Sequence, residues 1–185
     1  GLNLAASTVG GNFAATATTG NMTDSGALTI TGAATFRTSE SGSDIALDSS
    51  GNAFSNAVTL EADTGNEVFG NITFVDSAAV KLNSSASADG DLYINASTDG
   101  AVGGNLNITA TTDNITQGIA LAITGTSSFT TSANNETIAL DTTTNAFTGA
   151  ITITTNDNSG MDADVTIDGG TTALVLAAST IDGDL

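Results

Sequence analysis

The sequence predicts an all-β protein wound as a parallel β-helix, a β-solenoid of about two repeats of ~92 residues. Three observations support this prediction. The chain is rich in Thr, Ser, Asn, Asp and Gly and poor in the helix formers Lys, Arg and Glu, which is a composition of strands and turns. The sequence also repeats itself, and within each repeat short apolar, polar, apolar phrases follow Gly or Asn.

The repeat covers the whole chain. The stretch that begins MTDSGALTITGAATF at Met22 aligns without a gap to ITQGIALAITGTSSF at Ile115, an offset of 93 residues. Self-similarity at a long period is typical of solenoids, in which each unit buries its apolar face against the next. The aligned identities include Phe36 with Phe129, Leu47 with Leu140, Asp48 with Asp141, Asn52 with Asn145 and Phe54 with Phe147.

The repeat continues from the last residue to the first. DGDL at 182–185 followed by GLNLAASTVGGN at 1–12 matches DGDL at 89–92 followed by YINASTDGAVGGN. We therefore expect a single β-helical segment, 1–185, with one full unit at 22–114 and the second at 115–185 plus 1–21. The expected partner is the chain itself, as a head-to-tail homopolymer or as adjacent repeats of one giant chain. The predicted end-to-end interface consists of Gly1, Leu2, Leu4, Asp182, Asp184 and Leu185.

The individual strands are predicted from short alternating phrases. GALTI, DIAL, NAVTL, GNITF, GDLYI and GNLNI each place apolar residues two apart, which indicates a short strand with one buried face. We expect Phe36, Phe54, Phe129 and Phe147 to stack at corners of the coils. The predicted inward residues are Leu28, Ile30, Ile45, Leu47, Val58, Leu60, Ile72, Phe74, Val80, Leu82, Leu92, Ile94, Leu106 and Ile108, followed one unit later by Leu121, Ile123, Ile138, Leu140, Ile151, Ile153, Val165 and Ile167.

A competing prediction is a tandem pair of immunoglobulin-like β-sandwiches, because such a domain also has ~100 residues. The missing Trp, the single Tyr93 and the absence of Pro argue against it. The short sub-repeats within each unit also favour the solenoid.

The charge excludes several classes of partner. Two Lys or Arg residues stand against 20 Asp or Glu residues, for a net charge of -18. Such a polyanion cannot neutralise phosphates, so we expect no nucleic-acid binding, and anionic membrane surfaces would repel it. No apolar run approaches the ~18 residues of a membrane-spanning helix, so no membrane insertion is expected.

Catalytic chemistry finds little support in the sequence. The chain has no His and no Cys, which removes nucleophilic triads and most metal sites. Paired carboxylates could serve a glycosidase, but Asp48 and Asp141, like Asp89 and Asp182, recur in both units, so they belong to the turns. We expect no enzyme activity, no catalytic residue and no bound cofactor.

Calcium is the one metal that the composition allows, because it binds several oxygen ligands at once. The densest acidic cluster is TNDNSGMDADVTIDGG, and its counterpart in the other repeat, ADTGNEVFGNITFVDS, keeps fewer carboxylates. The candidate ligands are Asp157, Asp162 and Asp164.

Pairs of Thr two residues apart are similar to those of ice-binding solenoids. Such a surface needs the pair on every coil of one flat face, and many coils lack it. The pairs are Thr16 with Thr18, Thr29 with Thr31, Thr109 with Thr111 and Thr152 with Thr154.

SGALTITGAATF, IALDSSGNAFSNAVTL and STVGGNFAATATTGN resemble the β-strand repeats of very large bacterial surface proteins of the filamentous-haemagglutinin-like and autotransporter adhesin type. The resemblance covers essentially the whole chain and implies a right-handed β-helix displayed outside the cell. We therefore expect a non-catalytic structural shaft of an extracellular bacterial filament or giant surface adhesin, stacking end to end through Leu185 and Gly1. The alternative is a module that binds glycans or cells, which would need exposed aromatic side chains.

Overall fold

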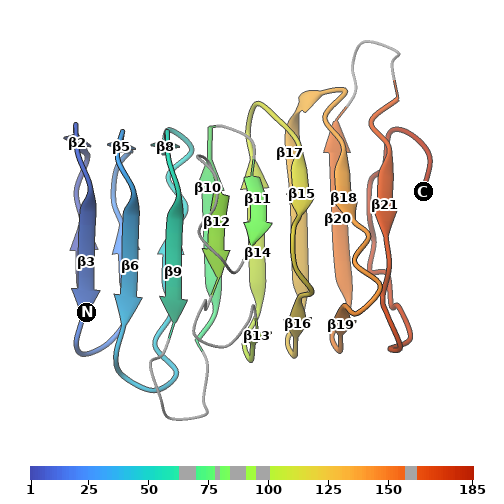
Figure 1. Ribbon diagram of the computed structural model, residues 1–185, viewed down its shortest axis with the longest axis horizontal. Coiled ribbons are helices and arrows are strands. Elements are labelled where there is room, and N and C mark those ends of the chain that lie inside the picture. The colour runs from blue at the N-terminus through green and yellow to red at the C-terminus, as the bar shows by residue number, and fades with distance from the viewer. Residues whose placement is uncertain (63–69, 78–79, 84–90, 95–100, 157–161) are drawn as a thin grey trace.

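In this computed structural model the chain winds as a right-handed parallel β-solenoid (Figure 1). The structure describes residues 1–62, 70–77, 80–83, 91–94, 101–156 and 162–185, of which 80–83, 91–94 and 101 are described by their backbone alone. Every regular element in these ranges is a β-strand, and every strand pair is parallel. The predicted fold class is confirmed. The tandem sandwich is wrong, because sandwich strands pair antiparallel.

One large sheet has seven strands. Paired residues on neighbouring strands lie one coil apart, from Leu2 opposite Met22 to Ile72 opposite Leu106. This register makes the inward and the outward side chains form files along the rod. In spatial order the strands are β1 (Leu2–Leu4), β4 (Met22–Asp24), β7 (Ile45–Leu47), β10 (Ile72–Asp76), β14 (Leu106–Ala110), β17 (Ser127–Asn134) and β20 (Ile151–Asn156).

The other large sheet has eight strands. Its order contains one exchange, because β12 lies between β9 and β11 although it follows β11 in the sequence. In spatial order the strands are β3 (Phe13–Ala17), β6 (Ala34–Thr38), β9 (Val58–Ala62), β12 (Asp91–Ile94), β11 (Val80–Asn83), β15 (Ile115–Gln117), β18 (Ile138–Leu140) and β21 (Val165–Ile167).

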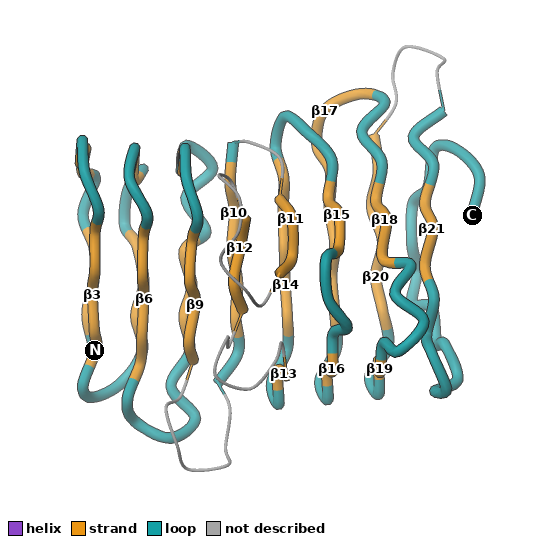
Figure 2. The backbone as a smooth tube through the Cα atoms, in the orientation of Figure 1, coloured by secondary structure: helices purple, strands orange, loops and turns teal. Residues whose placement is uncertain are grey.

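Two three-stranded sheets lie at the two narrow edges of the solenoid, one at the top and one at the bottom of Figure 1. The other described connections at these edges are loops, and the two termini lie at opposite ends of the long axis (Figure 2). The first edge sheet contains β2 (Ser7–Val9), β5 (Leu28–Ile30) and β8 (Ala53–Phe54), and the second contains β13 (Ala101–Val102), β16 (Ala122–Ile123) and β19 (Ala146–Phe147).

Equivalent strands of the two repeats lie in opposite large sheets. β4, β7 and β9 correspond to β15, β18 and β20 at the 93-residue offset, and each pair is divided between the seven-stranded and the eight-stranded sheet. The same exchange places β5 and β16 at opposite edges. One repeat therefore advances the chain by whole coils plus half a coil.

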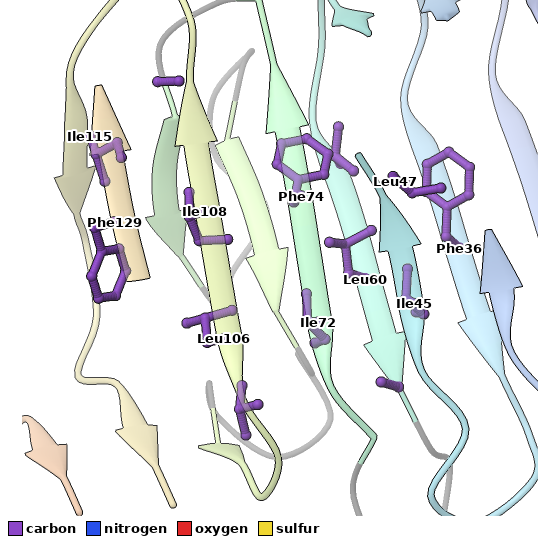
Figure 3. Close-up of a cluster of buried hydrophobic side chains, with 14 of the residues drawn as sticks. Phe36, Ile45, Leu47, Leu60, Ile72, Phe74, Leu106, Ile108, Ile115 and Phe129 are labelled. Carbon is purple, nitrogen blue, oxygen red and sulfur yellow. The ribbon is translucent and has the colours of Figure 1, made fainter. Parts of the chain in front are cut away.

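The core is one continuous apolar cluster along the rod, and its central part is shown in Figure 3. The ten side chains labelled there are at most 1% exposed. All predicted inward residues whose side chains are described are buried, except for the partly buried Ile167. Alternation alone predicts them because side chains on a strand point to the two faces in turn. Four predicted positions, Val80, Leu82, Leu92 and Ile94, lie where only the backbone is described.

The four phenylalanines are buried, but only two of them lie at corners. Phe54 and Phe147 belong to the edge strands β8 and β19, whereas Phe36 and Phe129 lie within the large sheets on β6 and β17. The corner prediction is wrong for Phe36 and Phe129, because their strands run for at least five residues and form flat faces. Phe36 meets Phe54 edge to face at 6.0 Å between ring centroids, and Phe129 meets Phe147 in the same way at 6.4 Å.

Candidate functional site

Asn52 joins two adjacent coils from inside the solenoid. Its side chain is fully buried, and its Oδ1 accepts a hydrogen bond from the Leu28 backbone N–H at 2.8 Å. Its Nδ2 donates to Asp24 Oδ2 at 2.7 Å, while Asp24 Oδ1 accepts from the Asp48 backbone N–H at 3.1 Å. The carboxylate of Asp24 is therefore used in holding the turn that precedes Asn52.

Asn145 makes the equivalent contacts in the other repeat, 93 residues later. Its Oδ1 accepts from the Leu121 backbone N–H at 2.9 Å, and its Nδ2 donates to Gln117 Oε1 at 3.1 Å. Nδ2 also lies within hydrogen-bond distance of the Leu140 and Asp168 carbonyl oxygens, at 3.1 and 3.0 Å. Recurrence of this amide at both positions indicates a structural role for it, since buried polar groups need partners.

A ladder of side-chain oxygens runs along the seven-stranded sheet, at the residue before each strand. Asn21 Oδ1 accepts from the Asp44 N–H at 3.0 Å, and Asp44 Oδ1 accepts from the Asn71 N–H at 2.8 Å. Asn71 Oδ1 then accepts from Asn105 N–H, and Asn105 Oδ1 from Thr126 N–H, both at 2.8 Å. The ladder was not predicted from the sequence, although the recurring GN before apolar residues was its signal.

The calcium candidates do not form a described ligand cluster. Asp162 and Asp164 are exposed, and Asp164 Oδ1 accepts the Asp184 backbone N–H at 2.9 Å, whereas Asp157 lies outside the described residues. Among the residues that the structure describes, no three acidic side chains gather to hold a metal ion. The same residues contain no helix long and apolar enough to cross a membrane.

The predicted end-to-end residues lie at the two ends of the rod. Leu2 and Leu4 are partly buried against the core, and Gly1 is exposed beside them. At the other end Asp182, Asp184 and Leu185 are exposed, with 65% of Leu185 accessible. Further apolar side chains are open at this end, namely Leu174, Val175 and Leu176. Contact between the two ends stays a prediction.

The two large sheets differ in the chemistry of their outer faces. On the eight-stranded sheet Arg37 and Glu61 are cross-strand neighbours and form an ion pair. The equivalent positions of the other repeat are Thr130 and Thr154, which are neighbours on the seven-stranded sheet. Exchange of sheets between repeats thus puts a charged pair on one face and a neutral pair on the other.

The predicted Thr pairs are spread over different faces. The pair at 16 and 18 begins on β3 of the eight-stranded sheet, and the pair at 29 and 31 begins on the edge strand β5. Only Thr152 and Thr154 form a complete pair on one strand of a large sheet, because Thr111 lies beyond the end of β14. The pairs named from the sequence do not make a common surface.

Comparison with protein families gives a match over most of the chain. The family of repeats of unknown function (DUF5649) matches residues 1–61 and 89–154, two stretches that agree in number with the two repeats. No curated protein matches the chain. No solved structure matches it either.

Proposed function

The chain belongs to the family of repeats of unknown function (DUF5649), and from this premise we propose that it is a non-catalytic structural shaft of an extracellular bacterial filament or giant surface adhesin. The observation that carries the proposal is that the recurring polar side chains serve the fold. Asn52, Asn145 and the ladder from Asn21 to Asn105 all bond one coil to the next. Residues repeated in this way support a rod of many coils.

Continuity between the ends supports stacking of units. The inward files of the solenoid reach both ends, where Leu2, Leu4 and Ile181 are only partly buried. Strand edges with unpaired N–H and C=O groups normally recruit further strands. DGDL at 182–185 followed by residues 1–12 matches DGDL at 89–92 followed by residues 93–105. We therefore propose that the next unit adds here, through Gly1, Leu2, Leu4, Asp182, Asp184 and Leu185.

The experiment is the mass of the native polypeptide after complete denaturation, followed by electron microscopy of the 185-residue chain. Units of one giant chain give a mass many times 18.1 kDa, whereas stacked subunits give a mass near it and rods of many lengths. Deleting residues 181–185 should abolish stacking of separate chains. Rods of unchanged length after this deletion, or a small native chain that never forms rods, would contradict the shaft.

One observation favours the alternative, a glycan-binding adhesin module. The chain has a single Tyr, and Tyr93 on β12 stands in register with Thr59 on β9, one strand from the Arg37–Glu61 pair. Lys81, the other cation of the chain, is in register with Asp91 on the same sheet. Unrepeated residues of these types on neighbouring strands are what recognition of sugars uses.

Glycan-array binding by the chain tests this alternative. If Tyr93→Ala abolishes binding while Phe13→Leu leaves it unchanged, the adhesin module replaces the plain shaft. A chain that binds no glycan on the array leaves the shaft as the function.

A further inference from the structure

Four strands of the seven-stranded sheet present a neutral outer surface, which we call the threonine face. Its residues are partly exposed, and none is charged. They form two files, because β10, β14, β17 and β20 pair in register. One file contains Thr73, Asn107, Ser128 and Thr152, and the other contains Val75, Thr109, Thr130 and Thr154.

Six of the eight side chains of the threonine face are β-branched, the others being Asn107 and Ser128. β-Branched residues have few rotamers, so ordering them against a partner costs little conformational entropy. Part of their hydrogen bonding is already made within the file, since Asn107 Nδ2 donates to Thr73 Oγ1 at 3.3 Å. Such a surface loses little conformational entropy and few hydrogen bonds when a closely fitting partner displaces its water.

The spacing of the two files favours a second copy of this chain as the occupant. Side chains in one file recur at ~4.8 Å, the distance between neighbouring coils, and the two files lie ~6.6 Å apart along each strand. Another copy of the chain has the same two spacings. Its files of side chains can therefore fit between the files of the first copy on every coil. Paired sheets that interdigitate small side chains in this way form dry interfaces ~10 Å thick.

Charge limits where two copies can meet. A chain with a net charge of -18 repels its copies, and a neutral surface lets two of them approach within the ~8 Å screening length of physiological salt with the least repulsion between facing groups. Asp76, which ends β10, is buried and accepts the Phe54 backbone N–H at 3.1 Å. The exposed Asp182 lies at the end of the rod, where its backbone N–H donates to Thr155 Oγ1 at 3.0 Å. On the outer side of the eight-stranded sheet Arg37 is exposed, whereas its ion-pair partner Glu61 is buried.

We propose that two copies of the chain pair side by side through their threonine faces, so that shafts bundle laterally. This inference rests on the proposed shaft, and it adds the surface by which one shaft recognises another.

The first test exchanges the chemistry of equivalent positions. Thr130→Arg with Thr154→Glu introduces on the threonine face the ion pair that the other repeat carries at the equivalent positions Arg37 and Glu61. We expect sedimentation velocity to show at least tenfold weaker pairing in this variant, and circular dichroism to show an unchanged fold. The matched control, Arg37→Thr with Glu61→Thr, should pair like the wild type.

The second test uses the absence of Cys from the chain. Thr130→Cys should cross-link efficiently with a short bismaleimide, whereas Arg37→Cys, at the same repeat position on the other sheet, should not. Equal cross-linking of the two variants, or pairing that survives the Thr130→Arg and Thr154→Glu exchange, would overturn the proposal. So would a wild-type chain that stays monomeric at high concentration or whose threonine face binds a polysaccharide instead.

Small-angle X-ray scattering separates this inference from the shaft itself. Lateral pairing enlarges the cross-section of the particle, whereas end-to-end stacking enlarges only its length. Longer particles of unchanged cross-section would therefore contradict the pairing and leave the shaft intact. Wider particles of unchanged length would support the pairing and contradict only the end-to-end stacking of separate chains.

Discussion

Ser127 places a hydroxyl between aliphatic side chains in the core. It stands on an inward position of β17, in register between Leu106 of β14 and Ile151 of β20. It is 2% exposed, and its Oγ has no hydrogen-bond partner among the described residues. A buried hydroxyl without a partner costs ~1–3 kcal/mol. Ala34 occupies the equivalent position of the other repeat, so the solenoid accepts the smaller side chain there.

We therefore predict that Ser127→Ala raises the free energy of unfolding by ~1 kcal/mol, because it removes an unpaired polar atom. Urea denaturation followed by circular dichroism measures the change. The control is Thr131→Val, which deletes the hydrogen bond from the fully buried Thr131 Oγ1 to the Glu136 carbonyl oxygen at 3.0 Å and should lower stability by about the same amount. A loss of stability in both variants would mean that the Ser127 hydroxyl is bonded.

At the scale of the element, the turns into the seven-stranded sheet depend on a close approach of backbones. A Cβ added to Gly149, just before β20, would lie 2.1 Å from the Gly125 carbonyl oxygen of the preceding coil. A Cβ on Gly125 would lie 2.4 Å from the Gly104 carbonyl oxygen in the same way. These glycines let successive turns stack at the spacing that the strands impose.

Gly149→Ala should accordingly lower the free energy of unfolding by about 1–3 kcal/mol, the usual cost of overpacking a tight site. Thermal unfolding of this variant can be compared with that of Gly10→Ala. A Cβ on Gly10 meets nothing within 4 Å, so this control should unfold like the wild type. Equal effects of the two substitutions would refute a steric role for Gly149.

The elements also show what the sequence could predict. Alternation marked Leu28 and Ile30 as inward because it distinguishes the two sides of a strand. It carries no information on where around the coil a strand lies, so the assignment of Phe36 to a corner was wrong and the exchange of sheets between repeats was not foreseen. Likewise, Asn21 and Asp44 were visible as turn residues, but their contact depends on register between coils.

For the whole molecule, the excess of carboxylates opposes folding. Like charges repel one another more strongly in the compact state than in the unfolded chain, and salt screens that repulsion. The Debye length falls from ~30 Å at 0.01 M to ~8 Å at 0.15 M. We predict that raising NaCl over this range stabilises the chain by ~1 kcal/mol, which corresponds to a Tm increase of about 2–4 °C.

Differential scanning calorimetry at low protein concentration measures this shift. Arg37→Thr with Glu61→Thr removes one positive and one negative charge, so its net charge is unchanged and its salt dependence should match the wild type. If salt lowers Tm instead, a few attractive pairs such as Arg37–Glu61 outweigh the net repulsion.

The half coil gained in each repeat bears on how such a chain can grow by gene duplication. A single duplicated unit does not take the orientation of its parent, because its strands enter the opposite large sheet. A substituted residue that is copied with the unit therefore lies on the other side of the rod. Duplication of two units at once keeps every side chain on its original side. A protein with one specialised side is thus inherited most simply in steps of two units.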